Sequence, residues 1–465
     1  MTSSSPTVQN TRSPDHDRLQ QSAKDNLVLH FAKQEIDDLP VIDRAEGPYV
    51  YDTKGRRYID ALSSLFCSQL GYSYGQEMAE AATKQLTTMA FNTSWGTAHP
   101  ATIDLAEKIS ELAPADDYRV FFTGGGSESV ESAWKMVREH FIAIGQPQRT
   151  KAIARDRAYH GVTLGALSFT GVQPFKEGFG TPPVEVTKVS NTNRFRADDG
   201  HDEAAFCARL LTEVEDAIIA AGADEVALII AEPVQNAGGC FTAPAGYWTG
   251  LRAIADRYGV LLMADEVITG FGRIGEWFAS SREGVAPDLI SVAKGLTSAY
   301  APMGAVLVRE RVIAPLVEQK KVFRHGITFG GHPLSAALAA KSIEIIERDQ
   351  VLENVRAQAD PLQARLQHLL DLPIVGDVRG AGFFWAMELV KDDEDTRFDQ
   401  GERGDLLRGF LPRRLREAGL IARCDDRGDA VLQIAPPLIS DAALLDDIVA
   451  GLTDVLRDAG KHMGL

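Results

Sequence analysis

The sequence predicts an α/β protein with a mostly parallel sheet covered by helices on both faces, plus a smaller α+β domain. Amphipathic helix patterns at Glu203–Ala221 and Tyr247–Tyr258 alternate with continuous apolar runs at Glu225–Ala231 and Val260–Ala264. Continuous apolar runs are typical of strands that are buried on both faces. Their alternation with helices favours a parallel sheet that lies between two helical layers.

The pattern changes at about Leu334, where long helices with a few short strands begin. Helices are expected at Ser335–Arg348, Leu352–Leu370, Asp405–Glu417 and Asp441–Ala459, and strands at Gly376–Arg379, Phe383–Leu389 and Ala430–Ile434. The segment Tyr49–Ile59 is expected to share their sheet. We therefore predict a flexible polar arm over 1–25, a segment joining the small domain over 26–70, a large domain over 71–333 and a small α+β domain over 334–465.

Composition argues against several classes of partner. A chain of 465 residues that is 45% hydrophobic buries a large core. Its net charge of −17 argues against nucleic acid or an anionic membrane as a partner. The four cysteines are scattered, as expected for reduced thiols in a cytoplasmic protein, and no Cys or His cluster has metal-ligand spacing. Apolar runs are shorter than the roughly 20 residues of a membrane span, and Met1–Asp15 has no signal-peptide core.

Two charged residues end apolar runs that predict buried strands. Lys294 follows the run at 286–293, and Asp265 follows Val260–Ala264. An ammonium group in such a place loses its hydration unless it is paired or neutral, and a neutral lysine is what Schiff-base chemistry requires. The carboxylate also needs a cationic partner, which a protonated pyridinium supplies. Together they are the two groups that pyridoxal phosphate requires of a protein.

A glycine-rich turn supplies a third element of the predicted site. Gly124–Gly126 separate the strand pattern Arg119–Thr123 from the helix pattern Ser127–His140. A turn of this kind at the start of a helix offers free N–H groups and a positive dipole end to a phosphate. The Gly-Lys-Ser/Thr of nucleotide-binding loops is absent, so the phosphate of a small cofactor fits better than a triphosphate.

Because these residues occur in this order along the sequence, the chain resembles the class III (omega) aminotransferases, which are fold type I pyridoxal-phosphate-dependent transferases. The motifs that carry the resemblance are FFTGGGSESVE, AYHGVT, AEPVQNAGG, ADEVITGFGRIG, AKGLTSAYAPMGA and HGITFGGHP. The resemblance runs from roughly Leu27 to the C-terminus. It implies that pyridoxal 5'-phosphate is the cofactor and that the domain over 71–333 binds it.

The resemblance also implies roles for single residues. It places ten residues at the cofactor: Lys294, Asp265, Gly125, Gly126, Ser127, Tyr159, His160, Glu232, Val267 and Thr328. Lys294 would be the Schiff-base lysine and the acid/base, and Asp265 the partner of the ring nitrogen. Tyr159 and Val267 would pack on the two ring faces. Thr328 would reach the phosphate of a neighbouring subunit, which implies a homodimer with shared active sites.

The phosphate turn departs from the family pattern at Gly124 and Gly125, where many relatives carry Asn-Ser. The change removes side-chain donors and leaves backbone N–H groups to hold the phosphate. We therefore expect weaker retention of the cofactor, although it still binds.

The substrate pocket is expected to be apolar and small. Ile268 stands where relatives that use glutamate often carry Gln, and Ala237 stands at the position of an acidic residue that gates an arginine. Both changes fit the amine:pyruvate branch of the family. Phe66, Trp95 and Tyr159 are candidates for the wall of the large pocket, and Ala237 for the small pocket.

A carboxylate acceptor needs a cationic partner in this pocket. Arg423 stands where the resemblance places a flexible carboxylate-binding arginine, and Arg427, in a loop that is longer than usual, is its rival.

The resemblance implies an omega-aminotransferase that moves an amino group from a primary amine to pyruvate, giving a ketone or aldehyde plus alanine by a ping-pong mechanism. The main alternative is an aminotransferase that acts on an omega-amino acid or diamine, such as beta-alanine, taurine or putrescine. A different reaction on the same scaffold, such as decarboxylation, and a non-catalytic regulator remain further alternatives.

Overall fold

The computed structural model describes residues 15–34, 36 and 38–465, and its centre is a seven-stranded sheet. In spatial order its strands are β4 (Tyr118–Thr123), β12 (Gly304–Arg309), β11 (Leu289–Val292), β10 (Leu261–Asp265), β7 (Val226–Ala231), β5 (Lys151–Arg155) and β6 (Glu185–Val189). β12 pairs antiparallel with β11 and β4, whereas the other pairs are parallel. The predicted mostly parallel sheet is therefore confirmed, although β12 was not predicted.

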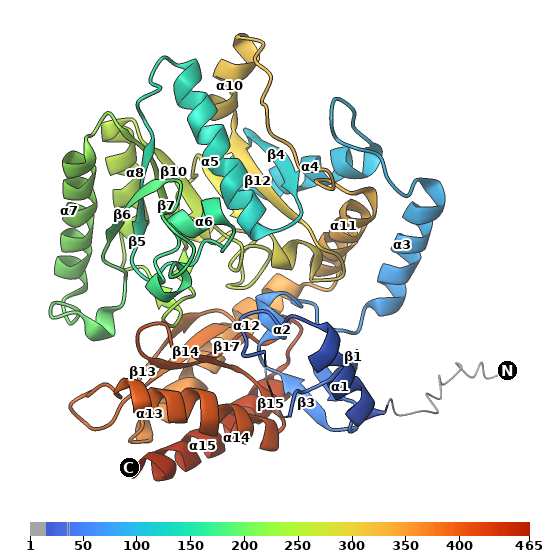
Figure 1. Ribbon diagram of the computed structural model, residues 1–465, viewed down its shortest axis with the longest axis vertical. Helices are drawn as coiled ribbons and strands as arrows, with labels where there is room; N and C mark the ends of the chain where they lie inside the picture. The colour runs from blue at the N-terminus through green and yellow to red at the C-terminus, as the bar shows by residue number, and fades with distance from the viewer. Residues whose placement is uncertain (1–14, 35, 37) are drawn as a thin grey trace.

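Helices cover both faces of this sheet because neighbouring strand residues point to opposite sides. Leu261 and Met263 of β10 pack into the core on one face, while Leu262 and Ala264 pack into the core on the other. The first face is covered by α5 (Gly126–Ala143), α6 (Leu164–Phe169) and α10 (Glu310–Glu318). The second is covered by α4 (Pro100–Leu112), α7 (Glu203–Ala221), α8 (Tyr247–Tyr258) and α11 (Pro333–Arg348) (Figure 1).

Two smaller sheets lie below the large one in the view of Figure 1. One consists of β13 (Val375–Ala381), β14 (Phe384–Leu389), β17 (Ala430–Ile434) and β16 (Arg423–Asp425), and the other of β1 (Ile42–Glu46), β2 (Tyr49–Asp52), β3 (Arg57–Asp60) and β15 (Leu420–Ile421). The prediction that Tyr49–Ile59 shares the sheet of the other C-terminal strands is wrong. Its partner is β15, which pairs parallel with β3 and is too short to show a strand pattern.

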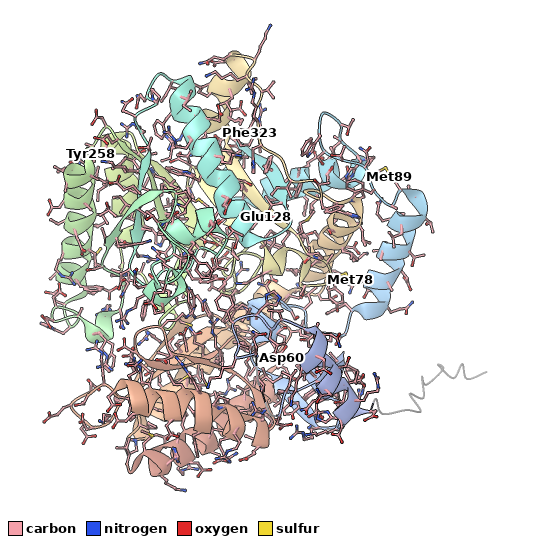
Figure 2. The ribbon with its side chains drawn as sticks, viewed as in Figure 1. Asp60, Met78, Met89, Glu128, Tyr258 and Phe323 are labelled. Atoms are coloured by element: carbon pink, nitrogen blue, oxygen red, sulfur yellow. The ribbon has the colours of Figure 1, made fainter. Side chains whose placement is uncertain are left out.

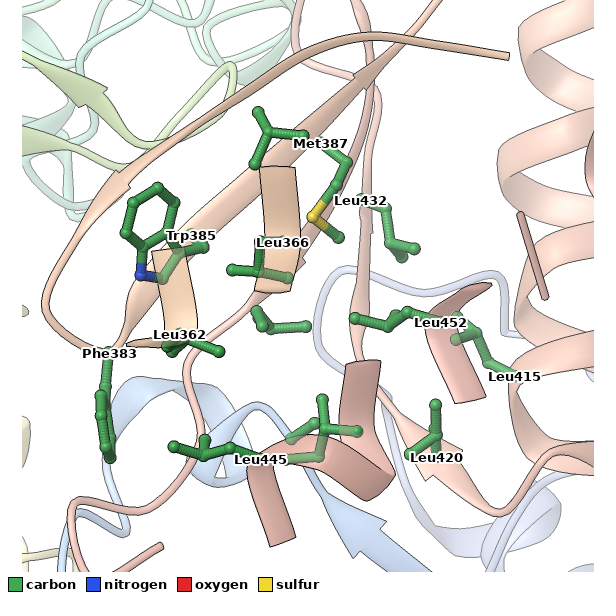
Figure 3. Packing of buried hydrophobic residues seen from close by; sticks show 14 of the residues in the cluster. Leu362, Leu366, Phe383, Trp385, Met387, Leu415, Leu420, Leu432, Leu445 and Leu452 are labelled. Atoms are coloured by element: carbon green, nitrogen blue, oxygen red, sulfur yellow. The ribbon is translucent and has the colours of Figure 1, made fainter. Parts of the chain in front are cut away.

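The helices of the C-terminal part surround an apolar core (Figure 3). They are α12 (Val351–Gln367), α13 (Gln400–Gly404), a π-helical turn at Asp405–Phe410, α14 (Leu411–Glu417) and α15 (Ala442–Met463). Leu366, Trp385 and Leu432 belong to this core, so the helices pack against the strands β14 and β17. The helix predicted over Asp405–Glu417 forms, but its first half has π geometry.

The remaining elements lie near the N-terminus or in connections. They include α1 (His16–Asn26), α2 (Ser63–Phe66), α3 (Gly75–Thr88), α9 (Ala279–Arg282), β8 (Val234–Gln235) and β9 (Phe241–Thr242). Most of the range 1–25 predicted as a flexible arm lies outside the described residues, and the part from His16 onward is the exposed helix α1. The domain boundaries stay predictions. None of the described helices is long and apolar enough to cross a membrane.

Asp288 fixes the register of β10 and β11 at the edge opposite their carboxyl ends. Its Oδ2 accepts hydrogen bonds from the Leu262 N–H at 2.8 Å and from Arg252 at 2.7 Å, and its Oδ1 accepts one from Arg311. The carboxylate therefore forms ion pairs with two guanidinium groups and accepts the hydrogen bond of a β10 N–H group.

We predict that Asp288→Ala lowers the free energy of unfolding by about 3 kcal/mol, because it leaves buried donors without a partner. Asp288→Asn, which keeps one acceptor, should cost less. Thermal unfolding followed by circular dichroism measures both. Equal midpoints for wild type and Asp288→Ala would show that this carboxylate does not hold the register.

Candidate active site

The carboxyl ends of four parallel strands meet at one cavity of about 1130 Å³. Asp265 ends β10, Glu232 follows β7, Lys294 lies two residues beyond β11, and Tyr159 and His160 belong to the loop after β5. All five line the cavity. Ligands of open α/β sheets bind at this edge, because loops that follow neighbouring parallel strands collect there.

Lys294 lines the cavity and is partly buried by the surrounding protein. Burial lowers the pKa of Lys294, although Cys67 and the carboxylates of Asp265 and Glu232 oppose the shift. Its Nζ lies 5.5 Å from the centroid of the Phe66 ring. Its backbone has φ of 40°, which β-carbon sterics disfavour and which surrounding packing must hold. The site therefore favours a neutral, nucleophilic amine.

Asp265 is fixed by three neighbours. Its Oδ1 accepts hydrogen bonds from Ser291 Oγ at 3.0 Å and from the Val267 N–H at 3.2 Å, and its Oδ2 lies 2.7 Å from His160 Nδ1. The register of β10 and β11 places Asp265 directly opposite Ser291. The carboxylate thus has one orientation, suited to a protonated ring nitrogen in the cavity.

The glycine-rich turn opens α5 directly beside these residues. A Cβ on Gly126 would lie 3.1 Å from both methyl groups of Val267, so a larger residue would push Val267 out of its place. A Cβ on Gly125 would meet nothing within 4 Å. The Gly124 N–H donates to Glu128 Oε2 at 2.7 Å, and Figure 2 labels Glu128 in the first turn of α5, near the middle of the molecule.

The cavity residues fit pyridoxal phosphate. Lys294 offers an amine for the aldehyde, Asp265 a carboxylate for the ring nitrogen, and the start of α5 at Gly126 and Ser127 offers N–H groups and a hydroxyl for the phosphate. Tyr159 and Val267 line the same cavity. These are the groups predicted from the sequence.

Glu232 holds the turn that carries Tyr159. Its Oε1 accepts the Tyr159 N–H at 3.1 Å, and its Oε2 accepts the Asn236 N–H at 3.0 Å. Burial raises the pKa of Glu232. The edge of Phe175 packs against Tyr159 with ring centroids 6.2 Å apart, and Phe31 packs against Phe175 at 5.2 Å. Glu232 therefore orients an aromatic wall that continues to the cavity mouth.

Two arginines enter the cavity from the C-terminal part. Arg423 makes no ion pair with any residue that the structure describes, and its guanidinium lies 5.7 Å from the Phe66 ring centroid. Burial and the nearby positive charge of Arg427 lower the pKa of Arg423 to about 10. By contrast, Asp425 binds Arg427 through two hydrogen bonds, one of them 2.7 Å from Nε. Arg423 is thus the arginine that has a guanidinium available for a ligand.

Four predicted residues do not line the cavity of this chain. Gly125 immediately precedes Gly126 in the chain, and Ala237 is fully buried, so the small-pocket role of Ala237 stays a prediction. Trp95 is 64% exposed, and Thr328 is also exposed. Neither therefore lines the pocket formed by its own chain.

Several residues of the cavity were missed from the sequence. Val234, Asn236, Arg403 and Arg408 line the cavity, and Ser291 lies behind it as a hydrogen-bond donor to Asp265. Ser291 had a visible signal, because it is a polar residue inside an otherwise apolar strand. Arg403 and Arg408 had no visible signal in the sequence, because their approach to the cavity depends on the π-helical turn.

Comparison with known proteins agrees with this geometry. The model of the family described as Aminotransferase class-III matches residues 31–456. A probable aminotransferase from Mycobacterium tuberculosis is 46% identical over 94% of each chain. A putrescine–pyruvate aminotransferase from Pseudomonas aeruginosa is 39% identical over 88% of each, and a mitochondrial gamma aminobutyrate transaminase from Solanum lycopersicum is 35% identical over 92% of this chain and 83% of its own.

Solved structures give the same result. An (S)-enantioselective omega-transaminase from Thermomicrobium roseum superposes with a TM-score of 0.91 at 36% identity, covering 95% of this chain and 98% of its own. An omega-transaminase from Pseudomonas jessenii in complex with PMP has a TM-score of 0.91 at 34% identity, covering 96% and 99%.

We predict that Gly125→Ser tightens binding of pyridoxal phosphate by roughly tenfold, because open space there admits a hydroxyl that can donate to the phosphate. Gly126→Ala should weaken binding, because its methyl group meets Val267. Equilibrium dialysis of apoprotein against the cofactor measures both dissociation constants. Weaker binding by Gly125→Ser would contradict this assignment of the phosphate turn.

Proposed function

The chain belongs to the class III aminotransferases, and on this basis we propose that it transfers an amino group from a primary amine to pyruvate by a ping-pong mechanism. The products are a ketone or aldehyde and alanine. The observation that carries the proposal is Arg423, which lies in the same cavity as Lys294 and whose guanidinium has no ion pair among the residues that the structure describes. A carboxylate is the natural partner of such a group, because the planar fork of arginine binds it bidentately.

The side chains of the cavity divide the chemical work. Pyridoxal phosphate, when bound, supplies an electron sink for the substrate carbon. Lys294, with its pKa lowered by burial, would hold the cofactor through its amine and, once freed, would carry the proton on Nζ from the substrate carbon to the cofactor. Asp265, held by Ser291 and His160, would accept a hydrogen bond from the protonated ring nitrogen.

The same pocket must accept a neutral amine and then a 2-oxo acid. Phe66 and Ile268 give it an apolar wall for the amine. Arg423 then binds the pyruvate carboxylate, and the Phe66 ring face interacts with the guanidinium while no carboxylate is present. Arg427 stays with Asp425 and shapes the wall.

We propose that the active sites are shared in a homodimer. Trp95 and Thr328 face away from the cavity of their own chain, and Trp95 packs close to Gly326 in the segment that carries Thr328. Phe91 and Phe329 are exposed beside them, with ring centroids 5.6 Å apart. A second chain on this surface would bring Thr328 to the partner's phosphate turn. We also propose a cytoplasmic location, which the four free cysteines support.

An omega-amino acid or diamine donor is the second candidate. The similarity to putrescine–pyruvate and gamma aminobutyrate transaminases supports it. Arg423, whose guanidinium has no ion pair among the described residues, favours the amino acid over the diamine, because a diamine is a dication at neutral pH.

The two half-reactions test the function directly. Holoenzyme is mixed with 1-phenylethylamine alone, and the ketone and the loss of the visible cofactor band are measured. Pyruvate is then added, and alanine and the return of the band are measured. One equivalent of ketone before pyruvate, and of alanine after it, is expected. A band that this amine leaves unchanged, but that an omega-amino acid bleaches, would favour the second candidate.

We predict that Arg423→Ala raises the KM for pyruvate by about tenfold or more, because a charged hydrogen-bonded pair is lost. The KM for a neutral amine should change far less. Arg423→Lys, which keeps the charge without the fork, should be intermediate. Steady-state kinetics with each substrate varied gives these values. Equal effects on the two substrates would remove Arg423 from the carboxylate site.

A further inference from the structure

Two arginines at the cavity mouth share one carboxylate. Arg403 Nε lies 2.8 Å from Asp426 Oδ1, and Arg408 Nη2 lies 2.8 Å from Asp426 Oδ2. All three residues line the cavity. Two positive charges therefore face one negative charge, and each guanidinium keeps further N–H groups that can bind a second anion.

The π-helical turn places the two arginines together. Residues five apart in an α-helix point about 140° away from each other. The turn Asp405–Phe410 has π geometry, in which N–H groups bond five residues back, and Arg403 and Arg408 reach the same carboxylate. The local backbone geometry thus presents both guanidinium groups to the cavity.

The other arginines of this wall have partners of their own. Asp425 binds Arg427, and Asp429 binds Arg157. An excess of positive charge therefore remains at two places, at Arg423 inside the cavity and at the Arg403–Arg408 pair at its mouth. This excess contrasts with a chain whose net charge is −17.

We propose that Arg403 and Arg408 form an outer carboxylate subsite, which binds the distal acid group of a long omega-amino acid while its amine reaches Lys294. The proposal rests on the aminotransferase function proposed above and narrows its donor class. Arginine suits this task because two N–H groups of one fork meet one carboxylate. Arg408 is 70% exposed and lines the same cavity as Lys294, so we expect a donor to need a long chain to reach from Lys294 to this solvent-exposed arginine.

The test compares omega-amino acids of three to eight carbons with n-alkylamines of the same lengths, with pyruvate as acceptor. The readout is the ratio of kcat/KM for the acid to that for the alkylamine. We expect this ratio to be highest for the longer donors in the wild type. In Arg408→Gln the ratio should fall by only about three- to fivefold, because water partly screens the charge that is removed. In Arg408→Glu the ratio should fall further, and kcat/KM for diamines should rise.

Arg413→Gln is the matched control. Arg413 is also exposed, on the neighbouring helix α14, and pairs with Glu417 outside the cavity. A ratio that changes equally in Arg413→Gln and Arg408→Gln would overturn the subsite, as would a ratio that Arg408→Glu leaves unaltered at every length.

The subsite can be tested even if the proposed function is wrong. If the wild type transfers no amino group from any donor, calorimetry with octanedioate still measures whether Arg408 binds a carboxylate. Weaker binding in Arg408→Gln than in Arg413→Gln supports it, and equal binding overturns it.

Discussion

The loss of water around the Lys294 amine is the constraint on which the site depends. Desolvation lowers the pKa of the Lys294 amine and therefore favours its neutral form. A neutral amine needs little counter-charge, which leaves Asp265 free for the ring nitrogen. Asp265 is in turn fixed by Ser291 and His160. The desolvation of Lys294 thus determines which charges the neighbouring residues must balance.

Much of the fold could be predicted, because burial leaves a periodic pattern in the sequence. The helices α7 and α8 and the strand β17 begin and end at the predicted residues. The strand β12 was missed although Gly304–Arg309 is an apolar run, and its antiparallel direction depends on the distant partners β11 and β4 and not on local composition. The two-residue strand β15 was missed because it is too short for any periodicity.

The inner site was more predictable than the pocket. Lys294, Asp265 and Ser127 were identified because each follows or ends an apolar element, and the structure brings all three to one cavity. The sequence could not show that Trp95 and Ala237 lie outside the cavity of their own chain, because an aromatic or small side chain carries no signal of the direction in which it points. The pairing of Arg427 with Asp425, which leaves Arg423 available, follows from side-chain geometry that sequence alone does not contain.

Chemical trapping of the cofactor is the most direct measurement of the central role of Lys294. Burial also lowers the pKa of Lys188, to about 7, yet this lysine lies outside the cavity and donates to the Phe169 carbonyl. It therefore serves as an internal comparison. Borohydride reduction of the holoenzyme followed by peptide mass spectrometry should place one cofactor per chain on Lys294. Label on Lys188, or none on Lys294, would contradict the assignment.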